Sequence, residues 1–348
     1  MRTADLPLHY GHAPSWLFRR MVKLAREMSV LIIDEYGEKE FLERLSNPFW
    51  FQGFGCVLGF DWHSSGVTTT VCGALKEAHL EDYGIAVCGG KKASKRTPLE
   101  IESKAEKLSV NSKATEDMKY ASKMAAKVDS SCIQDGYNLY QHSIFFSKKH
   151  WAVVQQGMNV ENRYARRYHW FNTPSFIFES EIVCNRRKEK VLNMASEKSK
   201  KSRQTSLDVL LDKEFERFST QKTLLNFSLN MPSHHNIRKI SKQTSEALRK
   251  AYEINPQNYE ELVAIRGIGP AAIRALALIS ELVYGAEPSW EDPVKYSFSH
   301  GGKDGIPYPV DRKTYDESIE MLKNAIENAK LGDKEKIGVL KRLHEIAK

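Results

Sequence analysis

The chain lacks the apolar segments that would place it in a membrane or direct it through one. Its 348 residues contain no uninterrupted apolar run of the roughly 18 residues that a membrane-spanning helix needs. The first residues, MRTADLP, have no apolar core of the kind that marks a signal peptide. We therefore expect a cytoplasmic protein without a membrane partner.

Cysteine is also scarce. The five cysteines form no C-x-x-C pair and lie mostly within apolar segments. We expect buried free thiols, and neither a disulfide framework nor a zinc site. The chain has no internal repeat and no P-loop, H-E-x-x-H or E-x-K signature. Any catalytic site must therefore be argued from less specific patterns.

What the chain does have is an uneven surplus of positive charge. The net charge is +8, and 41% of the residues are hydrophobic, which allows real cores in the two or three domains that this length permits. Residues 185–250 hold 16 basic and 7 acidic residues, which is more than the whole surplus. A basic segment of this kind suits contact with DNA phosphates, although a solvated connector has the same composition.

The most specific pattern is a short glycine-containing turn near residue 268. Asn258 and Glu261 have the spacing of a helix-capping pair. A Gly-Ile-Gly sequence then predicts a tight turn, and the proline after it suits the first position of a second helix. The N–H groups at that helix start, with the positive end of the helix dipole, form an anion site. The pattern predicts a helix-hairpin-helix that contacts DNA, with an ordinary pair of helices as the alternative. The predicted contacts are Gly267, Ile268, Gly269 and Pro270.

The order of the expected elements predicts an α+β protein. We predict an α/β-type domain with a small mixed sheet, which carries the catalytic candidates, for residues 1–184. A basic helical connector follows at 185–252, and an all-α helix-hairpin-helix domain at 253–348.

The first domain is expected to contain a parallel strand–helix–strand unit. Strands are predicted at 54–60 and 84–88, with a helix at 66–83 between them and another helix starting at Thr97. A β-hairpin is predicted for 142–155.

Polar residues follow both predicted strands, at 61–69 and 88–96. If the strands are parallel, both loops lie at the edge of the sheet where ligands bind. In the alternative, a serine caps the helix and the lysine run is a solvated turn. The residues predicted to hold a phosphate group there are Ser64, Ser65, Gly89, Gly90, Lys91 and Arg96.

Carboxylates and histidines provide a candidate metal site. Asp61, Asp129 and Asp135 are candidate ligands for Mg²⁺ or Mn²⁺, and His63 or His142 is the candidate base or a further ligand. These five residues form the predicted catalytic set. A glycine follows Asp135, so a simple turn is the alternative interpretation there.

Arginines interleaved with aromatic residues provide further candidate DNA contacts. In RYARRYHW, the side chains of Arg163, Arg166 and Arg167 can pair with phosphates and stack on bases, while an amphipathic surface segment is the alternative. Lys303, in a glycine-rich loop, is a further predicted contact. Asp311 stands just ahead of a predicted helix, where a capping role is the alternative to catalysis.

Several longer strings carry a family resemblance over nearly the whole chain. Among them are FGCVLGFDWHSSGVTTTVCGALKE at 54–77, QDGYNLYQH at 134–142 and SFSHGGKDGIPYPVDR at 297–312. The sequence resembles a prokaryotic, largely archaeal family known as domain of unknown function number seven-six-three. The resemblance implies a DNA-processing protein with an N-terminal catalytic part and a helix-hairpin-helix, in a family whose members look like nucleases more than anything else.

The C-terminal part also resembles the helix-hairpin-helix base-excision glycosylases. In those proteins a G-x-G hairpin is followed by a V-D pair ahead of a helix, and Val310 and Asp311 match that pair. The resemblance makes Asp311 a glycosylase-type catalytic candidate. Two departures speak against a lyase that uses a lysine: Ala271 occupies the position of the catalytic lysine, and the interval from the hairpin to Asp311 is long.

Three functional hypotheses follow. The first is a metal-dependent DNA nuclease, in which the N-terminal domain cuts while the hairpin holds DNA. The second is a monofunctional DNA glycosylase, in which Asp311 acts at a flipped base. The third is a non-catalytic DNA-binding module that recognises DNA ends or responds to nucleotides. DNA is the expected partner in each case, a homodimer is compatible with the sequence, and a requirement for Mg²⁺ or Mn²⁺ separates the first hypothesis from the second.

Overall fold

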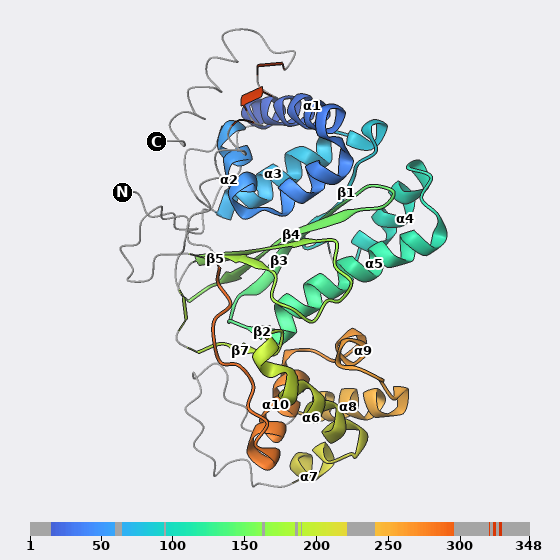
Figure 1. Cartoon of the computed structure of the whole chain (residues 1–348), viewed down its shortest axis with the longest axis vertical. Coiled ribbons are helices and arrows are strands. Elements are labelled where there is room, and N and C mark those ends of the chain that lie inside the picture. The colour runs from blue at the N-terminus through green and yellow to red at the C-terminus, as the bar shows by residue number, and fades with distance from the viewer. Residues whose placement is uncertain are drawn as a thin grey trace.

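The computed structural model is an α+β protein, as the order of elements predicts. Figure 1 shows a group of helices at one end, a sheet in the middle and a second group of helices at the other end. No described helix is both long and apolar enough to cross a membrane. The structure describes residues 15–59, 65–93, 95–161, 164–184, 187–188, 190–220, 241–295, 320, 323–324 and 327–328.

The first group of helices consists of α1 (Ser15–Ser46), α2 (Pro48–Val57) and α3 (Ser65–Glu77). Asn47 caps α2 by accepting hydrogen bonds from two backbone N–H groups of its first turn. The strand predicted at 54–60 is wrong, because this segment begins inside α2. That helix is buried on nearly all sides, and a short apolar run looks the same in a buried helix and in a buried strand.

The central sheet is antiparallel throughout. Its order is β1-β3-β4-β5-β6, and the β3–β4 pairing confirms the hairpin predicted for 142–155. The predicted mixed sheet is wrong, because β1 pairs antiparallel with β3 and no strand precedes α3 in the described part of the chain. The strands are β1 (Ala86–Lys91), β3 (Asn138–Phe146), β4 (Trp151–Asn159), β5 (Tyr164–Phe171) and β6 (Glu181–Val183).

The remaining elements cover the other face of the sheet and form the second group of helices (Figure 1). Helix α4 (Thr97–Lys107) begins at the predicted residue, and α5 (Ser112–Lys127) follows it. A small sheet pairs β2 (Ile133–Gln134) with β7 (Leu192–Asn193). The second group is α6 (Lys200–Leu211), α7 (Phe215–Thr220), α8 (Lys242–Ile254), α9 (Tyr259–Ala264) and α10 (Pro270–Tyr284), and short turns of helix are η1 (Leu80–Tyr83), η2 (Val128–Cys132) and η3 (Glu197–Ser199).

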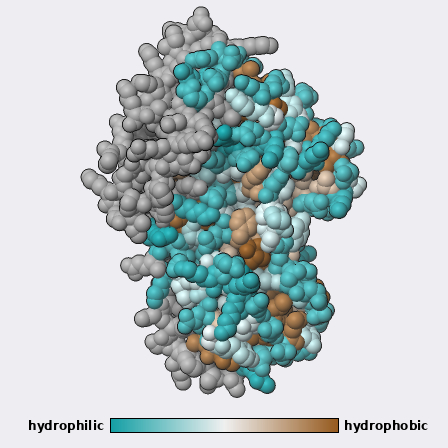
Figure 2. Space-filling view, viewed as in Figure 1, coloured by the Kyte–Doolittle hydropathy of each residue, from teal (hydrophilic) through white to brown (hydrophobic). Residues whose placement is uncertain are grey.

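Hydrophobic side chains pack on both faces of the sheet. Alternate residues of a strand face opposite ways, so Phe145 and Val154 join the core of α1–α3, while Ile144 and Val153 join the core that includes α5. This second core continues into α6, α8 and α10. All five cysteines are buried free thiols, as predicted. The face in Figure 2 is largely hydrophilic, with hydrophobic residues in small patches.

Candidate functional site

Helices α9 and α10 meet in a tight hairpin, as the sequence predicts. Asn258 caps α9 by accepting a hydrogen bond from Glu261 N at 2.9 Å, and the Glu261 carboxylate accepts one from Asn258 Nδ2 at 2.8 Å. Gly267 has a φ of +99°, a left-handed conformation that favours glycine. Pro270 occupies the first position of α10. Each local feature of the predicted hairpin is therefore present.

The start of α10 faces solvent. Arg266, Gly267, Pro270 and Ala271 are exposed, and no described side chain caps the helix at Gly269. A Cβ atom built on Gly269 has no other atom within 4 Å. Because the first N–H groups of a helix have no partner within it, this open end combines free donors with the positive end of a dipole. Its geometry and charge suit an anion such as phosphate.

Lys127, at the end of α5, fixes the hairpin from its carbonyl side. Its Nζ donates hydrogen bonds to the backbone oxygens of Val263 at 2.7 Å, Ile265 at 2.6 Å and Ile268 at 2.9 Å. The three hydrogens of the ammonium group thereby match three carbonyl groups. Burial lowers the pKa of Lys127 to about 8. The lysine thus anchors the turn to the end of α5.

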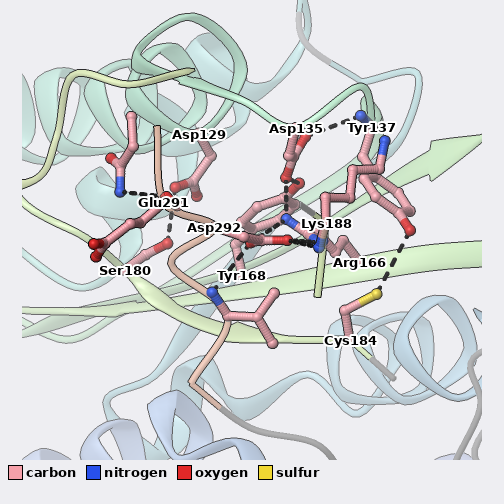
Figure 3. A network of polar contacts seen from close by, with 12 residues as sticks. Asp129, Asp135, Tyr137, Arg166, Tyr168, Ser180, Cys184, Lys188, Glu291 and Asp292 are labelled. Carbon is pink, nitrogen blue, oxygen red and sulfur yellow. Dashed lines mark hydrogen bonds and ion pairs between the residues drawn. The ribbon is translucent and has the colours of Figure 1, made fainter. Parts of the chain in front are cut away.

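Arg166, a predicted DNA contact, is instead fully buried among carboxylates. Its guanidinium donates to Asp135 at 3.0 Å and to Asp292 at 2.9 Å and 2.5 Å, as Figure 3 shows. Tyr168 Oη also donates to Asp135, at 2.6 Å. Burial opposes the positive charge, but the two carboxylates outweigh it and hold the pKa of Arg166 well above its ordinary value. The burial contradicts the predicted contact of Arg166 with DNA phosphates.

Arg167, its neighbour on β5, is buried in a second polar cluster. Its Nε donates to His169 Nε2 at 2.9 Å, and its terminal nitrogens approach Gln52 Oε1 at 3.3 Å. Thr68 of α3 lies 3.4 Å from the same guanidinium and donates to Gln156 Oε1 at 2.5 Å. Burial lowers the pKa of Arg167 to about 9. We call these five residues the Arg167 cluster; their burial contradicts the predicted DNA contact of Arg167.

The Arg167 cluster lies at the start of α3, where the first polar loop was predicted. Gln156 Nε2 donates to the carbonyl oxygen of Ser65 at 2.9 Å, and Ser65 is buried. Asp61, His63 and Ser64 lie outside the described residues, so their roles stay predictions.

The second predicted phosphate loop holds a carboxylate instead. Gly89 lies within β1, and its N–H donates to Glu100 Oε2 at 2.8 Å. Lys76 Nζ donates to the same oxygen at 2.6 Å. Because Glu100 already occupies this donor, the phosphate contact predicted at Gly89 is wrong. The other predicted contacts from this segment are exposed or half-exposed: Gly90, Lys91 and Arg96.

Asp129 and Asp135, predicted metal ligands, are buried and accept hydrogen bonds from protein groups. Asp129 accepts from Gln155 Nε2 at 2.5 Å, Trp170 Nε1 at 2.7 Å and Ser180 Oγ at 2.8 Å. Burial raises the pKa of Asp129 to about 7. A carboxylate in this setting does not fit a hydrated Mg²⁺ ion, which keeps several waters. In the part of the chain that the structure describes, no group of three His, Cys, Asp or Glu side chains could hold a metal.

His142 is the predicted catalytic histidine whose position is described. Its Nδ1 lies 2.8 Å from Gln155 Oε1, and its Nε2 lies 2.8 Å from Ser122 Oγ. Burial lowers the pKa of the imidazole, which favours a neutral ring near pH 7. The histidine therefore belongs to the same chain of hydrogen bonds as Asp129, between β3 and α5.

The sequence analysis did not identify four residues that shape these sites, namely Lys127, Gln134, Arg274 and Asp292. Arg274 carried a signal, because it interrupts an otherwise apolar helix. Each of the other three has a partner more than 100 residues away in the chain, which no local pattern reveals. Three further predicted residues, Arg163, Lys303 and Asp311, lie outside the described part of the chain.

Comparison with known proteins identifies the family. Residues 2–310 match the family model described as protein of unknown function (DUF763). The chain belongs to the DUF763 family. This confirms the family resemblance seen in the sequence, whereas the resemblance to glycosylases is not confirmed. No curated protein and no solved structure matches the chain.

Proposed function

We propose that this DUF763 protein binds the backbone phosphates of DNA, and that the hairpin between α9 and α10 makes the contact. The observation that carries the proposal is the open start of α10 at Gly269, where no described side chain caps the first N–H groups of the helix. The exposed lysines Lys201, Lys242 and Lys250 on α6 and α8 add positive charge to the same group of helices. Because phosphates carry no sequence information, binding should be similar for every base sequence.

Gly269→Val is the sharpest test of this proposal. Gly269 has an ordinary extended φ of −137°, and its Cβ position is open, so the variant should fold while its side chain covers the helix start. We expect DNA affinity to fall at least about tenfold, the loss of one hydrogen bond to a charged group, for every sequence tested. Fluorescence anisotropy with labelled duplexes measures the affinity, and thermal unfolding checks the fold.

Matched variants control this experiment. Gly73→Ala adds a Cβ that meets Phe18 at an ordinary 3.7 Å and should leave DNA affinity unchanged. Lys127→Met removes the donor to three hairpin carbonyls and should weaken binding more than Lys123→Met, which removes an exposed charge from the same helix. If a folded Gly269→Val protein binds DNA as tightly as the wild type, the hairpin is not the DNA contact.

As the reaction, we propose phosphodiester hydrolysis in the N-terminal part, which makes the protein a DNA nuclease. The Arg167 cluster supports this, because it gathers buried polar side chains at the start of α3, directly after the segment that contains Asp61 and His63. Such departures from an apolar core are common at functional sites. The proposed reaction requires a divalent ion, Mg²⁺ or Mn²⁺. Asp61 is its proposed ligand, whereas the buried Asp129 and Asp135 are not.

Metal dependence tests the nuclease proposal. Labelled single-stranded DNA, duplex DNA and duplexes with uracil or oxoguanine are incubated with Mg²⁺, with Mn²⁺ and with chelator. We expect strand cleavage with the metals and none in chelator. Base excision in chelator, scored as strand breaks after hot alkali, would favour the glycosylase instead. Binding without either reaction would favour the non-catalytic module.

A further inference from the structure

A pocket of about 350 Å³ lies beside the hairpin, within the usual size of small-molecule sites, about 300–1,000 Å³. Three parts of the chain form its walls. They are the first turns of α10, the segment from Ser130 to Asn138 and the end of β4 with the residues just after it. The pocket therefore adjoins the same helix start that we propose as the phosphate contact.

Arg274 brings a positive charge to the wall of this pocket. Its Nε donates to Gln134 Oε1 at 2.7 Å. The Gln134 amide is itself held, because its Nε2 donates to Ser131 O at 2.9 Å and to Pro270 O at 2.8 Å. One edge of the guanidinium is thus fixed, while no described residue accepts a hydrogen bond from its two terminal nitrogens, which can serve a ligand.

The charge of Arg274 has no acidic partner among the described residues. No ion pair involves it, and no acidic side chain raises its pKa, which burial alone lowers. Buried charges are usually paired, and Arg274 is half-buried. Two acidic residues line the pocket, but Asp135 is already paired with Arg166, and Glu161 is exposed at its rim. The pocket therefore combines an uncompensated cation with the positive end of the α10 dipole.

We propose that this pocket binds the terminal phosphate of a DNA strand whose backbone lies on the hairpin. The proposal rests on the proposed DNA-binding function and adds recognition of strand ends to it. Arg274 would hold the phosphate with its two terminal nitrogens, a geometry that suits phosphate oxygens. The exposed amide of Asn138 lies in the wall and would contact the attached nucleotide. A strand end can place its terminal phosphate in a pocket lined by three parts of the chain, whereas an internal phosphate must enter with the strand continuing on both sides of it.

The experiment compares duplexes that differ only at their ends. One set carries a 5′-phosphate, one a 3′-phosphate, and one hydroxyl groups at both ends. We expect the wild type to bind one of the phosphorylated ends about 10-fold to 100-fold more tightly than the hydroxyl end, the effect of a hydrogen bond to a charged group. Arg274→Met should bring this ratio close to one, and Arg274→Lys should keep part of it because the charge remains.

Arg266→Met is the matched control, because Arg266 is an exposed arginine of the hairpin that does not line the pocket. It should lower affinity for all three duplexes alike and leave the ratio unchanged. The inference is overturned if the wild type binds all three duplexes equally well, or if a folded Arg274→Met protein keeps the preference for a phosphorylated end. Either result leaves the DNA-binding proposal intact.

If the wild type binds no DNA, the proposed DNA-binding function is wrong. Small ligands then test whether the pocket binds phosphate. Calorimetric titration with a deoxynucleoside monophosphate and with inorganic phosphate measures the site directly. Binding by the wild type that Arg274→Met abolishes would support a phosphate site for a free nucleotide. No binding of either ligand would overturn it. Gln134→Leu, which releases the guanidinium but keeps its charge, provides a second variant should Arg274→Met fail to fold.

Discussion

Replacing Asp292 by alanine is expected to lower the free energy of unfolding by about 3–5 kcal/mol, the usual loss when one partner of a buried ion pair is removed. Arg166 is 0% exposed, and Asp292 accepts hydrogen bonds from both terminal nitrogens of its guanidinium. Asp292 also accepts hydrogen bonds from the backbone N–H groups of Lys188 at 2.7 Å and Val294 at 3.2 Å; Lys188 and Asp292 are labelled in Figure 3. The variant would leave Asp135 as the remaining partner of a desolvated charge and release two loops. Urea unfolding followed by circular dichroism measures the loss.

The neighbouring residue gives the control for this prediction. Glu291 pairs with Lys198, but their side chains are 70% and 65% exposed, so Glu291→Ala should change stability little. Equal stability of the Asp292→Ala and Glu291→Ala proteins would show that the buried pair does not hold these loops.

The hairpin could be predicted because every signal for it is local. Asn258 and Glu261 cap one helix, Gly267 allows the left-handed turn, and Pro270 starts the next helix. All of these residues lie within one short stretch of sequence. Backbone rules that act over a few residues therefore predict this turn without knowledge of its tertiary contacts.

The two arginines of β5 show why the buried polar clusters could not be predicted from the sequence. Arg166 and Arg167 are adjacent, so they face opposite sides of the sheet, and each is buried among polar groups from distant parts of the chain. Asp292 lies 126 residues from Arg166, and Gln52 lies 115 residues from Arg167. A sequence shows the charge of an arginine but not its partner, and an exposed arginine is the commoner case.

The direction of the sheet was missed for a related reason. The apolar segment from Phe54 onward has no periodicity that separates helix from strand. Interpreting it as a strand led to a parallel unit and placed two polar loops at one edge. In the structure the segment begins in α2, and β1 pairs with β3 in the opposite direction. One ambiguous segment therefore changed the expected position of the phosphate-binding residues.

Asp129→Asn is expected to stabilise the protein at pH 8 and to change its stability little near pH 4. Burial raises the pKa of Asp129 from an ordinary 3.8 to about 7, against the hydrogen bonds from Trp170, Ser180 and Gln155, which lower it. Between these two values the folded protein holds a proton that the unfolded chain has released. The contribution of this group to stability therefore falls as the pH rises through this window, by about 1.4 kcal/mol for each pH unit.

The asparagine variant has no such proton to lose. Its amide oxygen can take the position that accepts from Gln155 and Trp170, and its NH₂ group can donate to Ser180 Oγ, because a hydroxyl group also accepts. The difference in unfolding free energy between variant and wild type should therefore grow from about pH 4 to about pH 7 and stay constant above that.

Urea unfolding of both proteins across this pH range measures the difference, with Asp117→Asn as the control. Asp117 is an exposed carboxylate of α5, so its variant should show no comparable rise. A variant of Asp129 that is less stable than the wild type at pH 8 would contradict a raised pKa of Asp129, because it would mean that the three donors outweigh burial and favour the ionised carboxylate in the fold. If the expected rise is observed, Asp129 is a structural acid that stays protonated in the fold up to about pH 7, within the hydrogen-bond chain to His142, and metal-dependent cleavage should survive the substitution.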